Sequence, residues 1–178
     1  GGKHALGPRE GRDGEGRAGA ASLLPERYGA EPLRPVLGPL AVRETTPRQL
    51  DNIRVRARVR LADDAPFGAT KAEEGGEVLF RSYGVSGICI FNLSRFAEPG
   101  DALFIDFLPQ VDRAHVRRFL HARLTSLCAP DGPLCGAGEA PSGEAFLRGL
   151  LLPQVARAVL RQAGLDPEAP LREDDLSA

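Results

Sequence analysis

Residues 76–95 read GEVLFRSYGVSGICIFNLSR and give the clearest structural signal in the chain. The residues from Gly76 to Ser82 have the character of a short strand, and Gly84 suits a tight turn after it. A helix is expected from Gly87 to about Ala97. The hydroxyl of Ser86 is expected to cap this helix by accepting a hydrogen bond from an N–H group of its first turn. The segment therefore predicts a strand, a tight turn and a helix in succession.

The most regular strand pattern lies upstream, from Ile53 to Leu61, where aliphatic residues alternate with arginines. A period of two places the aliphatic side chains on one face and the arginines on the other. The face of arginines consists of Arg54, Arg56, Arg58 and Arg60. One interpretation is a solvated face paired with Asp or Glu of neighbouring strands; the other is a face that binds phosphates. The solvated face is favoured, because the net charge is −1 and the chain has two tyrosines and no tryptophan for stacking on bases.

Two further strands are expected, at Val36 to Glu44 and at Leu103 to Leu108. Between the first strands and the central segment, Ala62 to Gly75 is rich in Asp, Glu, Gly and Ala and predicts a loop. Beyond Val111 the apolar residues recur at helical spacing instead. Strands thus come first and helices second, which indicates an α+β fold and not the alternating pattern of a doubly wound dinucleotide fold.

The second half of the chain predicts three helices. Asp112 is placed to cap the first of them. The others are expected at Gly143 to Leu152 and at Pro153 to Ala163, since proline suits a first helical turn and Gly164 suits the residue after a helix. The acidic stretch Asp166 to Ala178 is expected to be a linker or a frayed end.

The composition is that of a soluble globular protein, with 42% hydrophobic and 26% charged residues. No apolar run approaches the roughly 20 residues that span a bilayer, and no signal peptide is recognisable, so a cytoplasmic protein is expected. The odd number of cysteines, three, indicates reduced thiols. The three histidines are scattered, so neither a metal site nor a catalytic residue is indicated.

The central segment resembles the signature "GE(L/V)LFTHYG(I/L)SGPA-ILQLSRY" of a bacterial flavoprotein family. This family is that of the NAD(P)/FAD-dependent oxidoreductases of the aminoacetone-oxidase-like or bile-acid-enone-reductase-like type. Three other stretches resemble the same family in the same order. These are Leu33 to Val42 (family "PL-PALVPLTV"), Asp106 to Pro109 ("IDLLPD") and Leu147 to Leu165 ("LKGLLPKRLAELLLEKAGI"). The chain departs from the signature at Ile88, where the family has proline.

The resemblance implies a small antiparallel β-barrel of Greek-key type followed by a small helical subdomain, inserted into an FAD-binding domain. Residues 1–32 would be the tail of the FAD-binding segment, a loop plus a short helix from about Glu15 to Arg27. Residues 33–110 would be the barrel, and residues 111–178 the helical part with a linker. The implied role is a cap that covers the flavin and shapes the cavity for a small-molecule substrate.

The glycine-rich start resembles the family's "TGG-SYPKTGSTGDGY", which lies near the flavin. The resemblance therefore marks Gly1, Gly2, Asp13 and Gly14 as cofactor-binding, because glycines let a backbone approach a ring or phosphate closely. A flexible glycine-rich end is the alternative. Tyr83 and Ser86 follow a strand end, where ligand contacts are common, and are candidates for the substrate cavity. Alternatively, Tyr83 packs on the barrel and Ser86 is only a cap.

The chain has no G-x-G-x-x-G after a first strand and no acidic residue on a following strand, and it starts with Gly-Gly and contains no methionine. We therefore expect a fragment whose partner is the rest of the FAD-binding domain. FAD, and NAD(P)H if it takes part, would be held by the parent protein, and the fragment alone would be inactive. The alternative function is a stand-alone binding module for a polyanion such as nucleic acid, or for a protein partner, that uses the arginine face.

Overall fold

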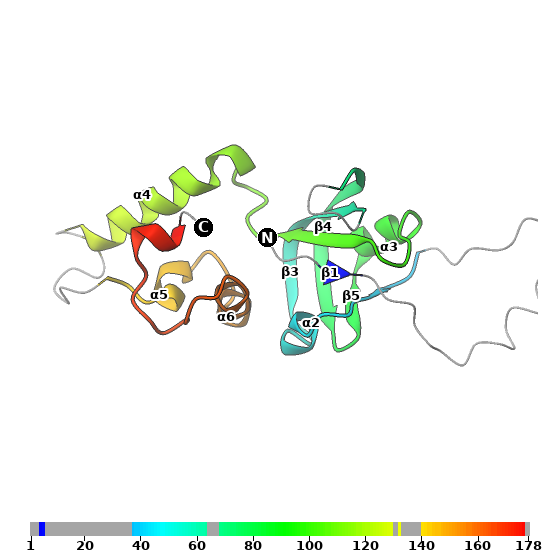
Figure 1. Cartoon of the computed structure of the whole chain (residues 1–178), viewed down its shortest axis with the longest axis horizontal. Helices are drawn as coiled ribbons and strands as arrows, with labels where there is room; N and C mark the ends of the chain where they lie inside the picture. The colour runs from blue at the N-terminus through cyan, green and yellow to red at the C-terminus, as the bar shows by residue number, and fades with distance from the viewer. Residues whose placement is uncertain (1–3, 6–36, 64–67, 130–131, 133–139, 177–178) are drawn as a thin grey trace, which may run out of the picture.

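The computed structural model describes residues 4–5, 37–63, 68–129, 132 and 140–176. Its strands form one curled sheet, and the helices that follow the last strand gather at one end of that sheet (Figure 1). The order of elements confirms the α+β class that the sequence predicts.

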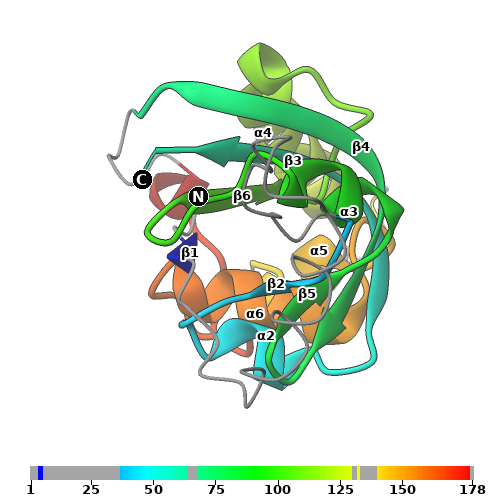
Figure 2. The same cartoon turned by 90° about the vertical axis from the view of Figure 1, so that its right-hand side faces the viewer.

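The sheet has six strands, each antiparallel to its neighbours, in the order β1-β6-β3-β4-β5-β2. Their bounds are β1 (His4–Ala5), β2 (Leu40–Ala41), β3 (Arg54–Ala62), β4 (Thr70–Arg81), β5 (Gly84–Ser86) and β6 (Ala102–Asp106). β3, β4 and β5 follow one another as hairpins, and β6 returns to lie beside β3. This is the connection of a Greek key. The sheet curls into a half-barrel (Figure 2), so the predicted Greek-key barrel is confirmed.

The alternation in β3 produces the core of the half-barrel as predicted. Ala57, Val59 and Leu61 are fully buried, whereas the arginines between them are exposed or half-exposed. Val78 and Phe80 of β4 pack in the same core. Burying each large side chain stabilises the fold by about 1.5–3 kcal/mol, so this inward face holds the sheet in its curled form.

β4 begins well before the sequence predicts. The expected loop from Ala62 to Gly75 is wrong in its second part, because β4 starts at Thr70 and pairs with β3 along its whole length. Glu73 lies opposite Arg60, and Glu74 lies opposite Val59. The polar composition of this stretch conceals a strand whose stability comes from its neighbour and not from its own residues.

The first predicted strand is shorter than expected. Of Val36 to Glu44 the structure describes residues 37–44, and within them Leu40–Ala41 forms β2, although the N–H group of Val42 still donates to the carbonyl of Tyr83 at 3.0 Å. β2 is an edge strand, and its partner β5 has three residues, so little pairing is possible. The chain then forms a helical turn, α2 (Thr46–Gln49), which has a proline in its first turn.

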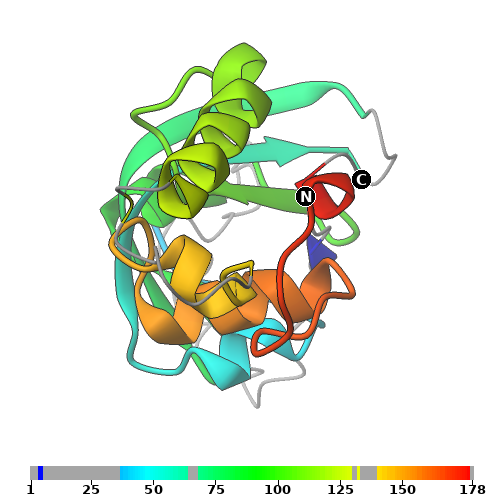
Figure 3. The ribbon, with the colours of Figure 1, turned by 90° about the vertical axis from the view of Figure 1, so that its left-hand side faces the viewer.

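The helical part lies at one end of the half-barrel (Figure 3). It consists of α4 (Val116–Cys128), α5 (Gly143–Leu147), α6 (Pro153–Gln162) and the 3-10 helices η2 (Arg113–His115) and η3 (Glu173–Leu176). The carboxylate of Asp112 accepts a hydrogen bond from the N–H group of Ala114 at 3.0 Å, so the predicted cap is confirmed. It caps η2, which leads directly into α4.

α6 agrees with its prediction, whereas α5 is shorter than predicted. Pro153 occupies the first turn of α6, and Gly164 follows the helix with a positive φ of 77°. The helix predicted from Gly143 to Leu152 ends at Leu147, and Gly149 takes a positive φ of 81° shortly after it. The residues between the two helices are therefore a connection and not a continuation of α5.

α6 contributes to two hydrophobic cores at once. Val155 and Ala158 pack in the core of the half-barrel. Ala156 and Leu160 pack in a second core that is built by the helices, together with Phe146. Different sides of one helix are therefore buried against different neighbours, and α6 joins the half-barrel to the helical part.

The predicted frayed end at Asp166 to Ala178 is wrong for the residues that the structure describes. Leu171 is 4% exposed, and its N–H group donates to the carbonyl of Pro141 at 2.8 Å. Leu176 of η3 packs against the second core. Two leucines within an acidic stretch anchor it to the helices, which the composition alone does not reveal.

No helix in the described part of the chain has the length and apolar character needed to cross a membrane. The short helix predicted at about Glu15 to Arg27 lies outside the described residues, as does most of the segment before Leu37.

Candidate functional site

Tyr83 directly precedes the short strand β5, and Ser86 ends it. Tyr83 is half-buried in the turn between β4 and β5, and its carbonyl accepts the hydrogen bond from Val42. Ser86 is the last residue of β5 and lies opposite Leu79 of β4. Gly84 and Val85 lie between them, and three steps along extended chain span about 10 Å. The structure therefore does not bring these two candidates together at one point.

Ser86 does not cap the helix that follows, so that prediction is wrong. The helix α3 (Ile88–Ser94) starts after Gly87, which occupies the cap position without a side-chain hydrogen bond. Ser86 belongs to the ladder of β5 instead, and strand pairing fixes its direction. Gly87 turns the chain from strand to helix with a φ of 117°.

Gly87 also lies very close to β4. A Cβ atom at this position would lie 2.3 Å from the carbonyl oxygen of Glu77, which no side chain tolerates. The same carbonyl accepts a hydrogen bond from the thiol of Cys89 at 3.2 Å. The start of α3 is thus held tightly against the middle of β4, and Cys89, Ile90 and Leu93 fill the space beneath it.

Cys89 is a buried free thiol. Burial is the main cause that raises the pKa of its thiol above the usual value, and the negative charge of Glu74 acts in the same direction. Because the thiolate is the reactive form, a raised pKa and a covered sulfur both slow alkylation. Cys128, at the end of α4, is exposed.

We expect Cys89 to resist alkylation in the folded protein. In a variant with Cys128→Ser and Cys135→Ser, iodoacetamide should modify Cys89 at least about 100-fold more slowly in buffer than in denaturing urea. The matched control carries Cys89→Ser and Cys135→Ser, and its Cys128 should react readily in buffer. Fast modification of Cys89 in buffer would contradict the position of α3 on the sheet. Mass spectrometry over time measures both rates.

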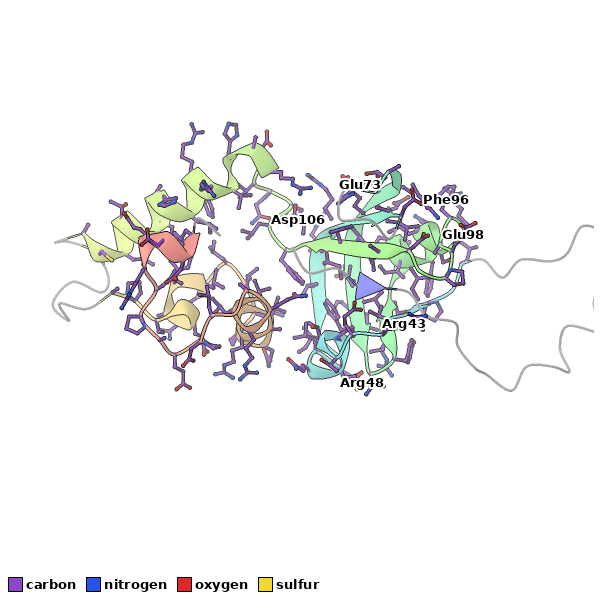
Figure 4. All side chains as sticks on the ribbon, viewed as in Figure 1. Arg43, Arg48, Glu73, Phe96, Glu98 and Asp106 are labelled. Carbon is purple, nitrogen blue, oxygen red and sulfur yellow. The ribbon has the colours of Figure 1, made fainter. Side chains whose placement is uncertain are left out.

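Exposed apolar side chains surround α3 at the end of the half-barrel away from the helical part. Ile88 is 78% exposed, Leu37 is 61% exposed and Phe96 is 44% exposed. The N–H group of Gly38 donates to the hydroxyl of Ser94 at 3.2 Å, which holds Leu37 beside the end of α3. We call these three residues together with Arg95 the α3 end patch. Figure 4 shows Phe96 at this end of the molecule.

A cluster of charges secures the turn between α3 and β6. The ammonium group of Lys71 contacts three carboxylates, those of Asp101 at 2.8 Å, Glu98 at 3.2 Å and Asp63 at 3.4 Å. Asp101 is 5% exposed and also accepts a hydrogen bond from the N–H group of Glu98 at 2.8 Å. The hydrogen bond to Asp101 is the main cause that raises the pKa of Lys71 above its ordinary value. These contacts hold the turn from Glu98 to Asp101, which follows the α3 end patch in the sequence.

Two of the four arginines on the outer face of β3, Arg54 and Arg58, are paired with acidic side chains, in line with the solvated-face interpretation. Arg54 contacts Glu77 at 3.4 Å and Arg58 contacts Glu73 at 3.6 Å, both across to β4. The guanidinium of Arg60 lies 4.1 Å from the ring centre of Phe104. Arg58 also donates to the carbonyl of Pro109 at 3.0 Å. Carboxylates on this face lower its positive potential, and a phosphate would compete with them.

The cofactor-binding candidates Gly1, Gly2, Asp13 and Gly14 lie outside the described residues. Within the described ranges, no group of three or more His, Cys, Asp or Glu side chains is arranged to hold a metal ion. The α3 end patch was not predicted from the sequence. Ile88 was its one visible signal, as an apolar residue at the start of a helix.

The sequence profile of a family described as "HI0933-like protein barrel and H2TH domain" matches residues 34–127 of the 178-residue chain. The chain belongs to this family. The matched range runs from the residues before β2 through the half-barrel and along nearly all of α4, so the barrel in the description corresponds to the curled sheet. The HI0933-like family is associated with FAD-dependent oxidoreductases. No curated protein matches the chain.

Proposed function

We propose that this HI0933-like chain is the insert region of an FAD-dependent oxidoreductase of the aminoacetone-oxidase-like or bile-acid-enone-reductase-like type. Its role is to cap the flavin and to shape the cavity for a small-molecule substrate. The hydride chemistry belongs to the flavin and to the rest of the parent protein, with NAD(P)H as the candidate reductant. The observation that carries the proposal is the Greek-key half-barrel within the family match, followed by helices.

The packed core and the paired surface charges of the described residues support a covering role. The half-barrel is filled by its own side chains, and α6 adds Val155 and Ala158 to the same core. Arg54 and Arg58 on the outer face of β3 have acidic partners, as does Lys71. A cap that excludes water from a flavin needs a rigid body of this kind more than it needs catalytic groups.

In the proposed enzyme, Tyr83 and Ser86 contact the substrate cavity from opposite ends of β5. Gly1, Gly2, Asp13 and Gly14 are the positions at which the chain would approach the flavin ring or its phosphates. The cofactors are then FAD in the parent protein and, for reduction, NAD(P)H. The stand-alone polyanion module is the weaker candidate, because Glu73 and Glu77 already engage the arginine face.

The proposal is tested by purifying two proteins, the 178-residue chain and the product of the reading frame extended on both sides of it. After incubation with FAD and gel filtration, we expect flavin absorbance with the extended protein in about one equivalent, and none with the chain alone. A flavin-free extended protein would overturn the proposal. Tight flavin binding by the 178-residue chain would do the same, since the site would then lie within the cap.

A further inference from the structure

Most of the exposed large apolar side chains in the described residues belong to α3 or to residues next to its ends. Four large hydrophobic side chains are exposed among the described residues, and three of them, Leu37, Ile88 and Phe96, belong to the patch. The fourth, Leu152, lies at the start of α6. Single exposed hydrophobic residues are normal on protein surfaces, whereas a group of them marks a surface that another body covers.

Arg95 gives the patch a polar specificity. Its guanidinium carbon lies 4.6 Å from the ring centre of Phe96, and in the part of the chain that the structure describes no carboxylate is bonded to it. Arginine stacked on an aromatic ring is typical of the residues that dominate binding energy at protein interfaces. The surface that fits the patch is therefore apolar and carries a carboxylate opposite Arg95.

The patch lies close to the described residues that flank segment 6–36. The described residues on either side of segment 6–36 both lie near this end of the half-barrel. On one side, β1 pairs with the first residues of β6, directly after the turn that Lys71 holds. On the other side, Leu37 belongs to the patch itself. Figure 1 shows α3 at the end of the half-barrel opposite the helical part. The other end is already occupied, because α6 packs into the barrel core there.

From these observations we infer that the α3 end patch is the surface on which the flavin-binding body of the parent protein docks. The body presents an apolar surface to Ile88 and Phe96 and a carboxylate to Arg95. This inference rests on the proposed function, in which residues before Leu33 are part of that body. It goes further by assigning the docking to one end of the half-barrel and to named side chains.

The test compares how fast a cysteine reacts at the patch in the 178-residue chain and in the extended protein. The background carries Cys128→Ser and Cys135→Ser, which leaves the buried Cys89. Phe96→Cys probes the patch, and Leu152→Cys is the matched control, since the two native side chains are 44% and 46% exposed. We expect the extended protein to label Phe96→Cys at least about 10-fold more slowly than the chain does, and Leu152→Cys at a similar rate in both.

Each outcome decides between the hypotheses. An extended protein that holds flavin but labels Phe96→Cys as fast as the chain does would overturn the docking surface and leave the proposed function intact. An extended protein without flavin would overturn both. Protection in the 178-residue chain alone that grows with protein concentration would assign the patch to a second copy of the chain and overturn the inference. Ile88→Cys repeats the measurement should Phe96→Cys fold poorly.

Discussion

Replacement of Gly87 by alanine should destabilise the protein by about 4 kcal/mol and lower its melting temperature by about 10 °C. Gly87 combines a φ of 117° with a ψ of 163°, a region of backbone space that only glycine enters readily. An added Cβ would also lie 2.3 Å from the carbonyl oxygen of Glu77. Either α3 moves off the sheet or the backbone at position 87 changes, and each disturbs the packing of Ile90 and Leu93.

The control for this substitution is Gly75→Ala. Gly75 lies in β4, its φ is outside the positive range, and an alanine Cβ at this position would meet no atom within 4 Å beyond its chain neighbours. The stability should change by no more than about 0.5 kcal/mol. Thermal melts followed by circular dichroism measure both variants. Equal melting temperatures for Gly87→Ala and Gly75→Ala would show that the strand-to-helix turn is not as the structure has it.

Asp101→Ala should cost about 2 to 3 kcal/mol of unfolding free energy. This carboxylate is 5% exposed and accepts hydrogen bonds from the ammonium of Lys71 and the N–H group of Glu98. Its removal leaves both donors without their best acceptor. Lys71 is 22% exposed and keeps Glu98 and Asp63, so the loss is smaller than for a fully buried pair. Urea unfolding at neutral pH measures the difference.

The loss of unfolding free energy caused by Asp101→Ala should become smaller at high pH. The folded state raises the pKa of Lys71, so the folded protein keeps that proton to higher pH than the unfolded chain does. The stabilisation is therefore fully present below the ordinary lysine pKa of about 10.4 and is lost as pH rises above it. The difference in unfolding free energy between wild type and Asp101→Ala should therefore decrease as the pH rises above that value.

The control is Glu77→Ala, which breaks an exposed ion pair and should change the unfolding free energy by less than about 1 kcal/mol at any pH. An equal loss of unfolding free energy in Asp101→Ala and Glu77→Ala would contradict the expectation that the buried ion pair contributes more than the exposed one.

The parts of the fold that depend on local pattern could be predicted from the sequence. The alternation from Ile53 to Leu61 defines β3, because burial of one face follows from the period of the residues themselves. Asp112 and Pro153 likewise mark starts of helical structure through bonds and torsions within one turn. These signals need no knowledge of the partner element.

The parts that depend on a distant partner could not be predicted. The first half of β4 is polar and becomes a strand because its backbone pairs with β3 through antiparallel hydrogen bonds. Ser86 and Gly87 are both suited to begin a helix, and only the pairing of β5 with β4 decides that Gly87 takes this position. The α3 end patch joins Leu37 to residues that lie about fifty or more positions later in the sequence, so its existence is visible only in three dimensions.

The double role of α6 has a consequence for how the chain can vary. Val155 and Ala158 must suit the half-barrel, while Ala156 and Leu160 must suit the helices, so these four buried positions of α6 cannot readily accept larger side chains. A change of size at Ala158 would be felt in the half-barrel, and one at Ala156 in the helical core. Diversification of the protein is therefore expected to spare this helix and to use the connections around it. The cap would keep its shape while the surfaces that meet a substrate change.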